Sequence, residues 1–294
     1  MIVPGETSQQ LGAALARETG RDLAQVSFER FPDGELLAAA PGFDGDRATI
    51  VAATTTAEAH IQLLQLQDAV REAGATHVTT VIPYLGYARQ DRPMEPGESV
   101  ESSRPGYPLS VRAVARAIST GTDRVVVVTP HETDVIDHFT VPATSVSGTP
   151  PLAEALPDDL VDPVFLAPDT GARSLASALA EAYGRGTVDH FEKTRHSGDT
   201  VTITPHNVSV NDRDIVIIDD IIATGSTMSE AIEQLGTAGA DRIIATCVHA
   251  QLTGAAHTRL ARAGVDRVIG TDTIEGPIST ASVAPVIAAQ LEDS

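Results

Sequence analysis

The fold class follows from one stretch, Asp212-Arg213-Asp214-Ile215-Val216-Ile217-Ile218-Asp219-Asp220-Ile221-Ile222-Ala223-Thr224-Gly225-Ser226-Thr227-Met228. Ile215 to Ile218 are four consecutive β-branched apolar residues, which is typical of a strand buried on both faces of a parallel sheet. Asp219 and Asp220 follow at its carboxyl end, and a turn of small residues comes next. From Met228 onward, apolar residues recur at the spacing of one helix face. The stretch therefore predicts a strand, two acids, a tight turn and a helix.

The turn predicts an anion site. Thr227 and Glu230 form a capping box, which places the start of the helix at the turn. Free backbone N–H groups and the positive end of the helix dipole would then point at one place, and a phosphate suits it. Carboxylates repel phosphate, so Asp219 and Asp220 are expected to face a neutral, hydroxylated part of the same ligand, as in a ribose phosphate. The alternative is an ordinary strand, Asp-Asp turn and capped helix, which any α/β protein can contain.

Composition limits the protein class. A chain of 294 residues can form two domains, each with its own core. No run of about 18 apolar residues occurs, so no transmembrane span is predicted. The N-terminus lacks the basic start and apolar core of a secretory signal. Cys247 is the single cysteine, which excludes an internal disulfide. These features predict a cytoplasmic protein without a membrane partner.

The charge is strongly negative. Forty acidic residues against twenty basic ones give a formal charge of −20, which disfavours nucleic acid as a partner. Only one of the basic residues, Lys193, is a lysine. An acid-rich, lysine-poor surface indicates a halophile, whereas a merely acidic mesophilic protein would seldom lose nearly every lysine. If lysine has been removed elsewhere, Lys193 is expected to have a task.

A short unit recurs along the chain: a helix end at Gly, a polar pair, and a strand rich in β-branched residues. Its copies are 73–82, 121–128, 238–244 and 263–269. Two copies in each half predict an α/β protein with two tandem, doubly wound parallel-sheet domains. Pro and Gly cluster between 141 and 157, so we place the domains at 1–145 and 146–294. Other predicted features are a helix over 7–19, a strand over 49–53, a helix from 61 to 74, a turn-rich segment at 28–35 and a mobile loop at 93–108.

Polar residues also follow other predicted strands. Arg89 and Arg92 come after the strand 78–82, where they could stack on a base or grip a phosphate, or form a charged surface turn. His131 follows the strand that ends at Val128 and is either a metal or phosphate ligand or a structural histidine. Asp169 begins a second strand, acid, Gly turn and helix series. The sequence contains no Walker loop and no Cys/His cluster with zinc spacing.

Residues 212–228 resemble the phosphoribosyl-diphosphate motif of type I phosphoribosyltransferases. Further motifs stand in the order found in ribose-phosphate pyrophosphokinases, and they are Phe31-Pro32-Asp33-Gly34-Glu35, Tyr87-Ala88-Arg89-Gln90-Asp91-Arg92, Pro130-His131-Glu132, Ala167-Pro168-Asp169-Thr170-Gly171-Ala172, Glu192-Lys193-Thr194-Arg195 and Asp219 to Thr227. The chain looks most like the archaeal members, over nearly its whole length. The resemblance implies two domains of the type I phosphoribosyltransferase kind. It also implies an enzyme that transfers diphosphate from ATP to the anomeric hydroxyl of ribose 5-phosphate.

The resemblance further implies a role for each motif. The ATP-binding residues would be Phe31, Asp33 and Glu35, which reach the adenine from a neighbouring subunit, with Arg89 and Gln90. Lys193 and Arg195 would belong to a catalytic flap, and His131 and Asp169 would lie at the Mg²⁺–triphosphate. Ribose 5-phosphate would be held by Asp219, Asp220, Thr224, Gly225, Ser226 and Thr227. A site shared between subunits implies a homodimer or a higher homo-oligomer.

Two departures from the family pattern stand out. Bacterial members commonly have an acid where Ala223 stands, and the loop 93–108 is longer than usual. Two alternatives to this enzyme remain. An ordinary phosphoribosyltransferase would share the ribose-phosphate site, but has no need for a second domain carrying Phe31–Glu35 and Arg89–Arg92. A non-catalytic regulatory homologue predicts eroded site residues, yet Lys193 is present.

Overall fold

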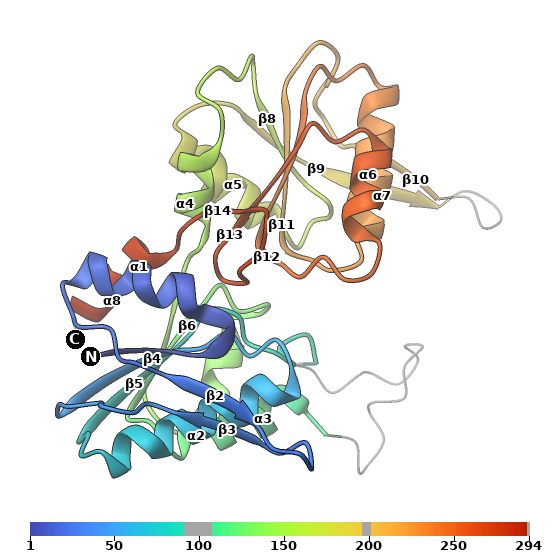
Figure 1. Cartoon of the computed structure of the whole chain (residues 1–294). Coiled ribbons are helices and arrows are strands. Elements are labelled where there is room, and N and C mark those ends of the chain that lie inside the picture. The colour runs from blue at the N-terminus through green and yellow to red at the C-terminus, as the bar shows by residue number, and fades with distance from the viewer. Residues whose placement is uncertain (91–107, 196–200, 293–294) are drawn as a thin grey trace. The chain divides into compact units, whose positions relative to one another are not determined.

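The computed structural model describes residues 1–90, 108–195 and 201–292, with the backbone alone for 193–195 and 201–204 (Figure 1). Asp91, Arg92 and the predicted mobile loop 93–108, apart from Pro108, lie outside the described residues. The chain forms two compact units. The first is Met1–Ser147 with Thr273–Glu275 and Val283–Ser294, and the second is Gly148–Asp272 with Gly276–Ser282. The units thus differ from the predicted division into 1–145 and 146–294 near the C-terminus, where the chain returns to the first unit.

The first unit contains a parallel five-stranded sheet with helices on both faces. The strand order is β1 (Ile2–Pro4), β4 (Arg47–Val51), β5 (His77–Ile82), β6 (Arg124–Val128) and β7 (Ala143–Val146). Figure 1 shows α1 (Gln9–Thr19) and α8 (Ala284–Glu292) on one face, with α2 (Ala57–Glu72) and α3 (Ser110–Ser119) on the other. Two short 3-10 helices, η1 (Glu6–Ser8) and η2 (Thr133–His138), also belong to the unit.

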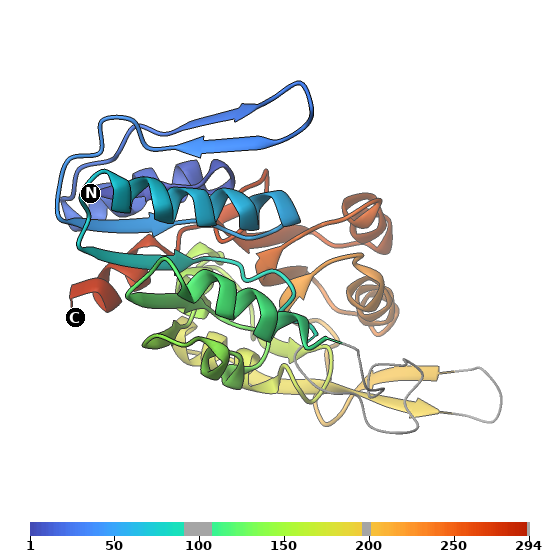
Figure 2. The ribbon, with the colours of Figure 1, turned by 90° about the horizontal axis from the view of Figure 1, so that it is seen from below.

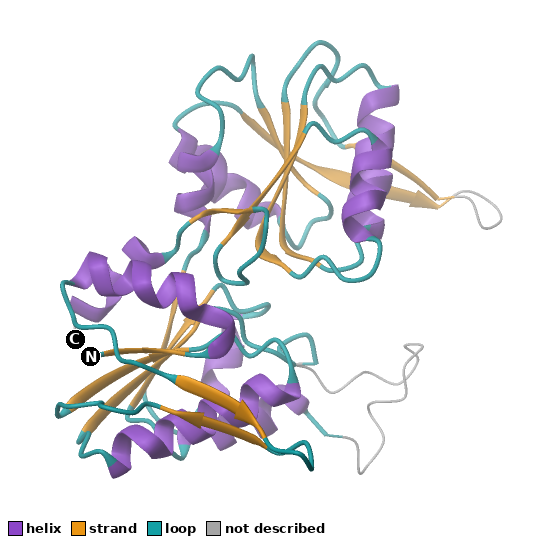
Figure 3. Cartoon of the chain, viewed as in Figure 1, coloured by secondary structure: helices purple, strands orange, loops and turns teal. Residues whose placement is uncertain are grey.

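The second unit is built around a seven-stranded sheet. The strand order is β10 (Val201–Pro205), β9 (Thr187–Arg195), β8 (Val164–Ala167), β11 (Ile215–Ile222), β12 (Ile243–Ala250), β13 (Arg267–Thr271) and β14 (Ser279–Ala281). Only β10 runs antiparallel to its neighbour. Figure 3 shows α4 (Thr149–Ala155) and α5 (Arg173–Tyr183) on one face, and α6 (Ser226–Thr237) and α7 (Ala256–Ala263) on the other. Both units therefore have the predicted doubly wound arrangement.

The central strand β11 is longer than its apolar run. Ile215 to Ile218 are fully buried between β8 and β12, as the sequence predicted. The strand continues to Ile222, so Asp219 and Asp220 lie inside it and do not follow it. The pairing of Asp219 with Cys247 and of Ile221 with His249 explains the difference, because β12 is long enough to hydrogen-bond the extra residues.

Strand β11 is also fixed at its start, by a buried carboxylate. The Asp214 side chain is 1 % exposed and accepts hydrogen bonds from the Val161 backbone and the Arg242 guanidinium. Burial opposes its charge, but these hydrogen bonds and the Arg242 charge outweigh burial and lower the pKa of Asp214. The ionised form is therefore part of the folded structure.

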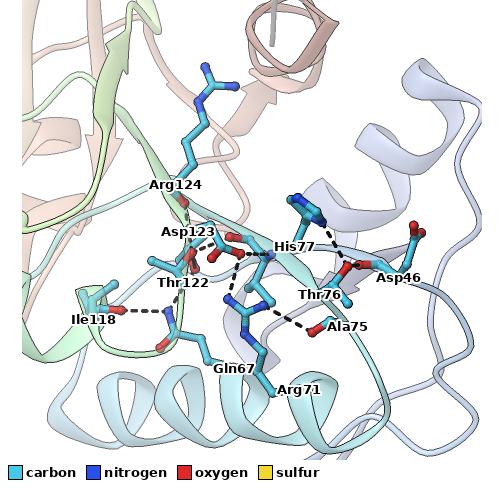
Figure 4. Close-up of polar contacts among 12 residues, drawn as sticks. Asp46, Gln67, Arg71, Ala75, Thr76, His77, Ile118, Thr122, Asp123 and Arg124 are labelled. Carbon is cyan, nitrogen blue, oxygen red and sulfur yellow. Dashed lines mark hydrogen bonds and ion pairs between the residues drawn. The ribbon is translucent and has the colours of Figure 1, made fainter.

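A polar network fixes helix α2 to the amino ends of β5 and β6 (Figure 4). Asp123 accepts hydrogen bonds of 2.7 Å from the Val78 backbone and from Arg71 of α2. One turn earlier, the buried Gln67 amide donates to the Thr80 hydroxyl at 3.0 Å. The Asp123 contacts lie at the amino ends of β5 and β6, and the Thr80 contact lies in the middle of β5, so the carboxyl ends stay free for a ligand site.

The start of α1 is satisfied by a residue far away in sequence. The Ser8 side chain makes no capping hydrogen bond at this helix. Glu275 accepts hydrogen bonds from the backbone N–H groups of Gln10 and Leu11, at 2.7 and 2.9 Å. Its negative charge also suits the positive end of the helix dipole. α8 packs on the same helix, so α1 depends on two late segments of the chain.

The predicted turn-rich segment 28–35 is a β-hairpin. β2 (Ser27–Arg30) and β3 (Leu36–Ala39) are antiparallel, with the turn 31–35 between them. Figure 2 shows the hairpin at the edge of the first unit, outside α2. The Pro-Asp-Gly turn dominates the sequence pattern here, and the strands carry no regular alternation of apolar and polar residues, since β3 is Leu-Leu-Ala-Ala.

Candidate functional site

The turn between β11 and α6 has the geometry of an anion site. Gly225 stands at the N-cap of α6 with φ of 72°, a left-handed conformation that favours glycine. The helix begins at Ser226, so Thr227 lies in its first turn and the predicted capping box with Glu230 is wrong. The first N–H groups of a helix have no intrahelical partner and remain available to a ligand. The turn that was predicted to bind phosphate is thus present, and no side chain caps the helix that follows it.

An arginine that the sequence analysis missed borders this turn. Arg259 of α7 donates a hydrogen bond to the Ser226 hydroxyl, which lies 3.2 Å from the Thr224 hydroxyl. α6 and α7 pack side by side, and a Cβ on Gly225 would meet the Ala256 carbonyl at 3.5 Å. A guanidinium beside two hydroxyls strengthens the case for an oxyanion. No sequence spacing pointed to Arg259, since only the packing of two helices brings it there.

The two acids of β11 form a crowded carboxylate pair. Both are half-buried, and the Asp219 carboxylate accepts a hydrogen bond of 2.9 Å from the Asp220 backbone. Burial, the Asp220 charge and, to a smaller extent, the Asp169 charge raise the pKa of Asp219 to about 8. Such a pair is stabilised by ligand hydroxyl donors or by a cation, either of which offsets the repulsion.

Asp169 belongs to the neighbouring strand and faces the same edge of the sheet. It follows β8, which pairs with β11. One Asp169 oxygen accepts hydrogen bonds from the Gly171 and Ala172 backbone, at 2.9 and 3.2 Å. Its charge contributes to the raised pKa of Asp219, so the two carboxylates share one electrostatic environment. The structure therefore brings Asp169 together with Asp219 and Asp220, two of the residues predicted to bind ribose 5-phosphate, at one sheet edge.

Lys193 and Arg195 lie on the hairpin formed by β9 and β10. Lys193 is paired with Ile203, and Arg195 with Val201. Figure 2 shows this hairpin extending well beyond the helices of its unit. For these two residues the structure describes the backbone alone, so their role as catalytic residues stays a prediction.

In the first unit, the predicted nucleotide residues follow two adjacent strands. Arg89 and Gln90 are exposed in the turn after β5, and His131 is exposed after β6. Parallel strands present their carboxyl ends at one edge, which places all three on the same side of the sheet. His131 belongs to the first unit and Asp169 to the second, and a joint role in holding metal stays a prediction.

The turn that carries Arg89 is tightly packed, which the sequence analysis also missed. The Thr54 hydroxyl accepts a hydrogen bond of 2.9 Å from the Gly86 backbone, and the Tyr84 carbonyl accepts one of 2.8 Å from the Thr54 backbone. A Cβ on Gly86 would lie 2.1 Å from the Thr54 carbonyl oxygen, which excludes any side chain at the present backbone position. Tyr87 follows with φ of 65°, an uncommon conformation for a bulky residue. The position of Arg89 thus depends on close backbone contact.

The remaining predicted ATP residues lie at the tip of the β2–β3 hairpin. Phe31 is 43 % exposed, and Asp33 and Glu35 are exposed beside it. The Asp33 carboxylate accepts a hydrogen bond of 3.1 Å from the Glu35 backbone. A cavity of about 430 Å³ adjoins this tip, with Glu35 and Ile61 in its lining. An exposed aromatic on a projecting turn is well placed to meet a partner outside its own unit.

Residues 1–121 match the N-terminal domain of ribose phosphate pyrophosphokinase, and residues 153–283 match the phosphoribosyl transferase domain. A ribose-phosphate pyrophosphokinase of Halobacterium salinarum is 53 % identical over 289 residues, which are 98 % of this chain and 99 % of the relative. The chain belongs to the ribose-phosphate pyrophosphokinase family.

Other members of the ribose-phosphate pyrophosphokinase family agree with this assignment. The protein of that name from Methanosarcina acetivorans is 41 % identical and covers 99 % of both chains. The crystal structure of phosphoribosylpyrophosphate synthetase from Mycobacterium smegmatis matches with a TM-score of 0.80 at 25 % identity, covering 99 % of this chain and 97 % of that one. The Halobacterium relative agrees with the predicted halophilic source. Among the described residues, no helix is both long and apolar enough to span a membrane.

Proposed function

We propose that this protein transfers the diphosphate of ATP to the anomeric hydroxyl of ribose 5-phosphate, giving phosphoribosyl diphosphate and AMP. One observation carries the proposal: the full-length match to ribose-phosphate pyrophosphokinases includes both domains. The anion turn and acid pair of β11 support it independently, because a ribose phosphate needs both an oxyanion site and hydroxyl acceptors. In such a transfer the protein mainly supplies positioning and charge neutralisation.

Ribose 5-phosphate would bind along the end of β11. The N–H groups and hydroxyls of Thr224, Gly225, Ser226 and Thr227 would hold the 5-phosphate, with Arg259 reaching the same group. Asp219 and Asp220 would accept hydrogen bonds from the ring hydroxyls. Ionised carboxylates are the better acceptors, and ring hydroxyls would offset the burial and the repulsion from Asp220 that raise the pKa of Asp219.

ATP would meet residues of the first domain. Arg89 and Gln90 would contact the nucleotide from the end of β5. Phe31, Asp33 and Glu35 would reach the adenine from a second subunit, since their hairpin tip projects from its own domain. This arrangement would require at least a homodimer. ATP would therefore bind to the N-terminal domain, and ribose 5-phosphate would bind to the C-terminal domain.

Mg²⁺ would bind beside the transferred phosphates. The donor set fits, because Mg²⁺ takes one or two carboxylates together with phosphate oxygens, and Asp169 lies in a region of crowded negative charge. His131 would contribute from the nucleotide side. When bound, the ion neutralises charge on the triphosphate. Lys193 and Arg195 would then stabilise the charge that develops during transfer, and the enzyme would act in the cytoplasm.

The test is an incubation with ATP, Mg²⁺ and ribose 5-phosphate, analysed for AMP and phosphoribosyl diphosphate. An ordinary phosphoribosyltransferase or a regulatory homologue would release no AMP. The variant with Asp219→Asn and Asp220→Asn should raise the KM for ribose 5-phosphate and leave the KM for ATP nearly unchanged. If the KM for ATP alone moved, the assignment of this turn would be wrong.

A further inference from the structure

Three side chains at the base of the β9–β10 hairpin gather on one face. His190 and Glu192 are two apart in β9, so they point to the same side of the sheet. His206 follows β10, and its backbone donates a hydrogen bond of 3.0 Å to the His190 carbonyl, which puts the two histidines directly opposite each other. The His190 and His206 rings lie 5.1 Å apart, and Nδ1 of His206 lies 2.7 Å from a Glu192 oxygen.

The three side chains offer convergent ligand atoms. One nitrogen from each histidine and one Glu192 oxygen all lie within 4.8 Å of one another. Metal–nitrogen and metal–oxygen bonds are about 2.0–2.2 Å long, so the ligand atoms around a single ion lie at most about 4.4 Å apart. Small side-chain rotations would bring all three into contact with one ion.

A second observation points to a ligand. The His190 side chain is only 8 % exposed, and its Nδ1 has no hydrogen-bond partner among the residues that the structure describes. The nearest carboxylate oxygen, on the buried Asp189, is 3.6 Å away. Asp189 is itself held by the Asn207 and Val208 backbone, at 2.8 and 3.0 Å. A buried carboxylate beside Nδ1 is the usual second partner of an imidazole that binds metal through its other nitrogen, so Nε2 of His190 is the ligand atom that the proposal below requires.

We propose that His190, Glu192 and His206 bind a divalent transition-metal ion of the Zn²⁺ class. Two imidazoles and a carboxylate suit Zn²⁺ and Co²⁺, whereas Mg²⁺ prefers oxygen ligands. The site is separate from the Mg²⁺ site proposed at Asp169 and does not rest on the proposed activity. A fourth position is open to water because Glu192 and His206 are exposed.

A bound ion would cross-link the two strands of the hairpin. His190 and Glu192 come from β9, and His206 comes from the residue after β10. The strand pairing from His190 outward leads directly to Lys193, so the ion would hold the hairpin at its base. A bound ion would then limit how far the β9–β10 hairpin, which carries Lys193, can move relative to the rest of the sheet.

The experiment is a Co²⁺ titration of the untagged, full-length protein in concentrated KCl, followed by visible absorption. Excess Mg²⁺ in every sample occupies sites made of oxygen ligands. Glu192→Gln and His206→Ala remove one ligand each, and His257→Ala removes an exposed histidine of α7 as the matched control. The Glu192 and His206 side chains are 52 % and 38 % exposed, so neither substitution threatens the fold. Thermal unfolding of each metal-free variant verifies this.

We expect the wild-type protein and His257→Ala to develop the intense visible bands of four- or five-coordinate Co²⁺, with one ion bound per chain, and Zn²⁺ to abolish them. Glu192→Gln and His206→Ala should each lose at least about tenfold in Co²⁺ affinity, the smallest loss typical of a disrupted metal site. Absence of the bands in the wild-type protein would overturn the inference. Equal titration curves for all four proteins would overturn it as well. Neither result depends on AMP formation, so the proposed activity stands or falls separately.

Discussion

Replacing Gly86 by alanine should displace the proposed ATP-binding residues Arg89 and Gln90 through backbone packing alone. The added Cβ would lie 2.1 Å from the Thr54 carbonyl oxygen, whereas real contacts of this kind are longer than 3.0 Å. The turn must therefore move by about 1 Å, which strains the hydrogen bonds that join Thr54 to Tyr84 and Gly86. Overpacking costs about 1–3 kcal/mol and a weakened hydrogen bond about 1 kcal/mol, so we expect a loss of about 2–4 kcal/mol. For a domain of this size that corresponds to a Tm lower by roughly 4–16 °C.

The same displacement moves Arg89 and Gln90, which end the turn. A misplacement of about 1 Å can cost up to about 100-fold in rate, so we expect kcat/KM for ATP to fall at least about tenfold. The KM for ribose 5-phosphate, whose proposed site is in the other domain, should change little. The assays are thermal unfolding and steady-state kinetics with each substrate varied in turn.

Gly236→Ala provides the matched control. This glycine lies within α6, and a Cβ there would meet nothing within 4 Å. Alanine should stabilise the helix by about 0.5–1 kcal/mol, with no kinetic effect. If Gly86→Ala showed the same Tm and ATP kinetics as Gly236→Ala, the close contact with Thr54 would not hold in the protein, and the explanation of how Arg89 is positioned would fail.

Four further outcomes are expected. Lys193→Ala should lower turnover by about 10²–10³ while moving either KM far less, and Lys193→Arg should restore it only partly; near-normal turnover of the alanine variant would remove its catalytic role. Phe31→Ala should weaken ATP binding by roughly 1–3 kcal/mol in calorimetry with an unchanged Tm, and unaltered affinity would exclude base stacking. Asp214→Asn should lower the Tm at pH 7. Because the pKa of Asp214 is lowered in the folded state, the stability that its ionised form supplies is complete above about pH 4 and is lost as the pH falls through the folded pKa. The difference in Tm between variant and wild type should therefore shrink near pH 3, and a difference that is the same at all pH values would contradict this. Dilution into low salt should lower the Tm, since repulsion among forty acidic residues is screened when the Debye length is about 3 Å at 1 M salt, and a Tm independent of salt would refute the halophile interpretation.

The parts of the fold that the sequence predicted depend on local patterns. The run Ile215–Ile218 predicted a buried strand because four β-branched residues suit a position covered on both faces, and the structure buries them fully. The recurring unit, a helix that ends at Gly followed by a strand rich in β-branched residues, predicted the parallel αβ units in the same way. The end of β11 was wrong by four residues, because its length is set by pairing with β12 and not by its own composition.

The parts that were missed depend on contacts between distant segments. Arg259 meets Ser226 through helix packing, and Glu275 caps α1 from 265 residues after Gln10. His190 and His206 lie opposite each other, but this can be seen only when the hairpin register is known, because their sequence spacing matches no metal motif. Short sequence patterns carry no information on such pairs. The expected task of Lys193 also followed from its being the single lysine, and the catalytic role of Lys193 and the ATP-binding role of Phe31 stay predictions.

The capping of α1 by Glu275 also affects the order in which the protein can be completed. A ribosome makes β1 and α1 first and α8 last, yet α8 packs on α1. The nascent first domain can form its sheet early, but the start of α1 stays unsatisfied and the surface that α8 covers stays exposed throughout synthesis of the second domain. Apolar surface exposed for that long is a target for chaperones and for aggregation with other nascent chains. The first domain is therefore the first to emerge and the last to be completed, because Glu275 and α8 are synthesised only after most of the second domain.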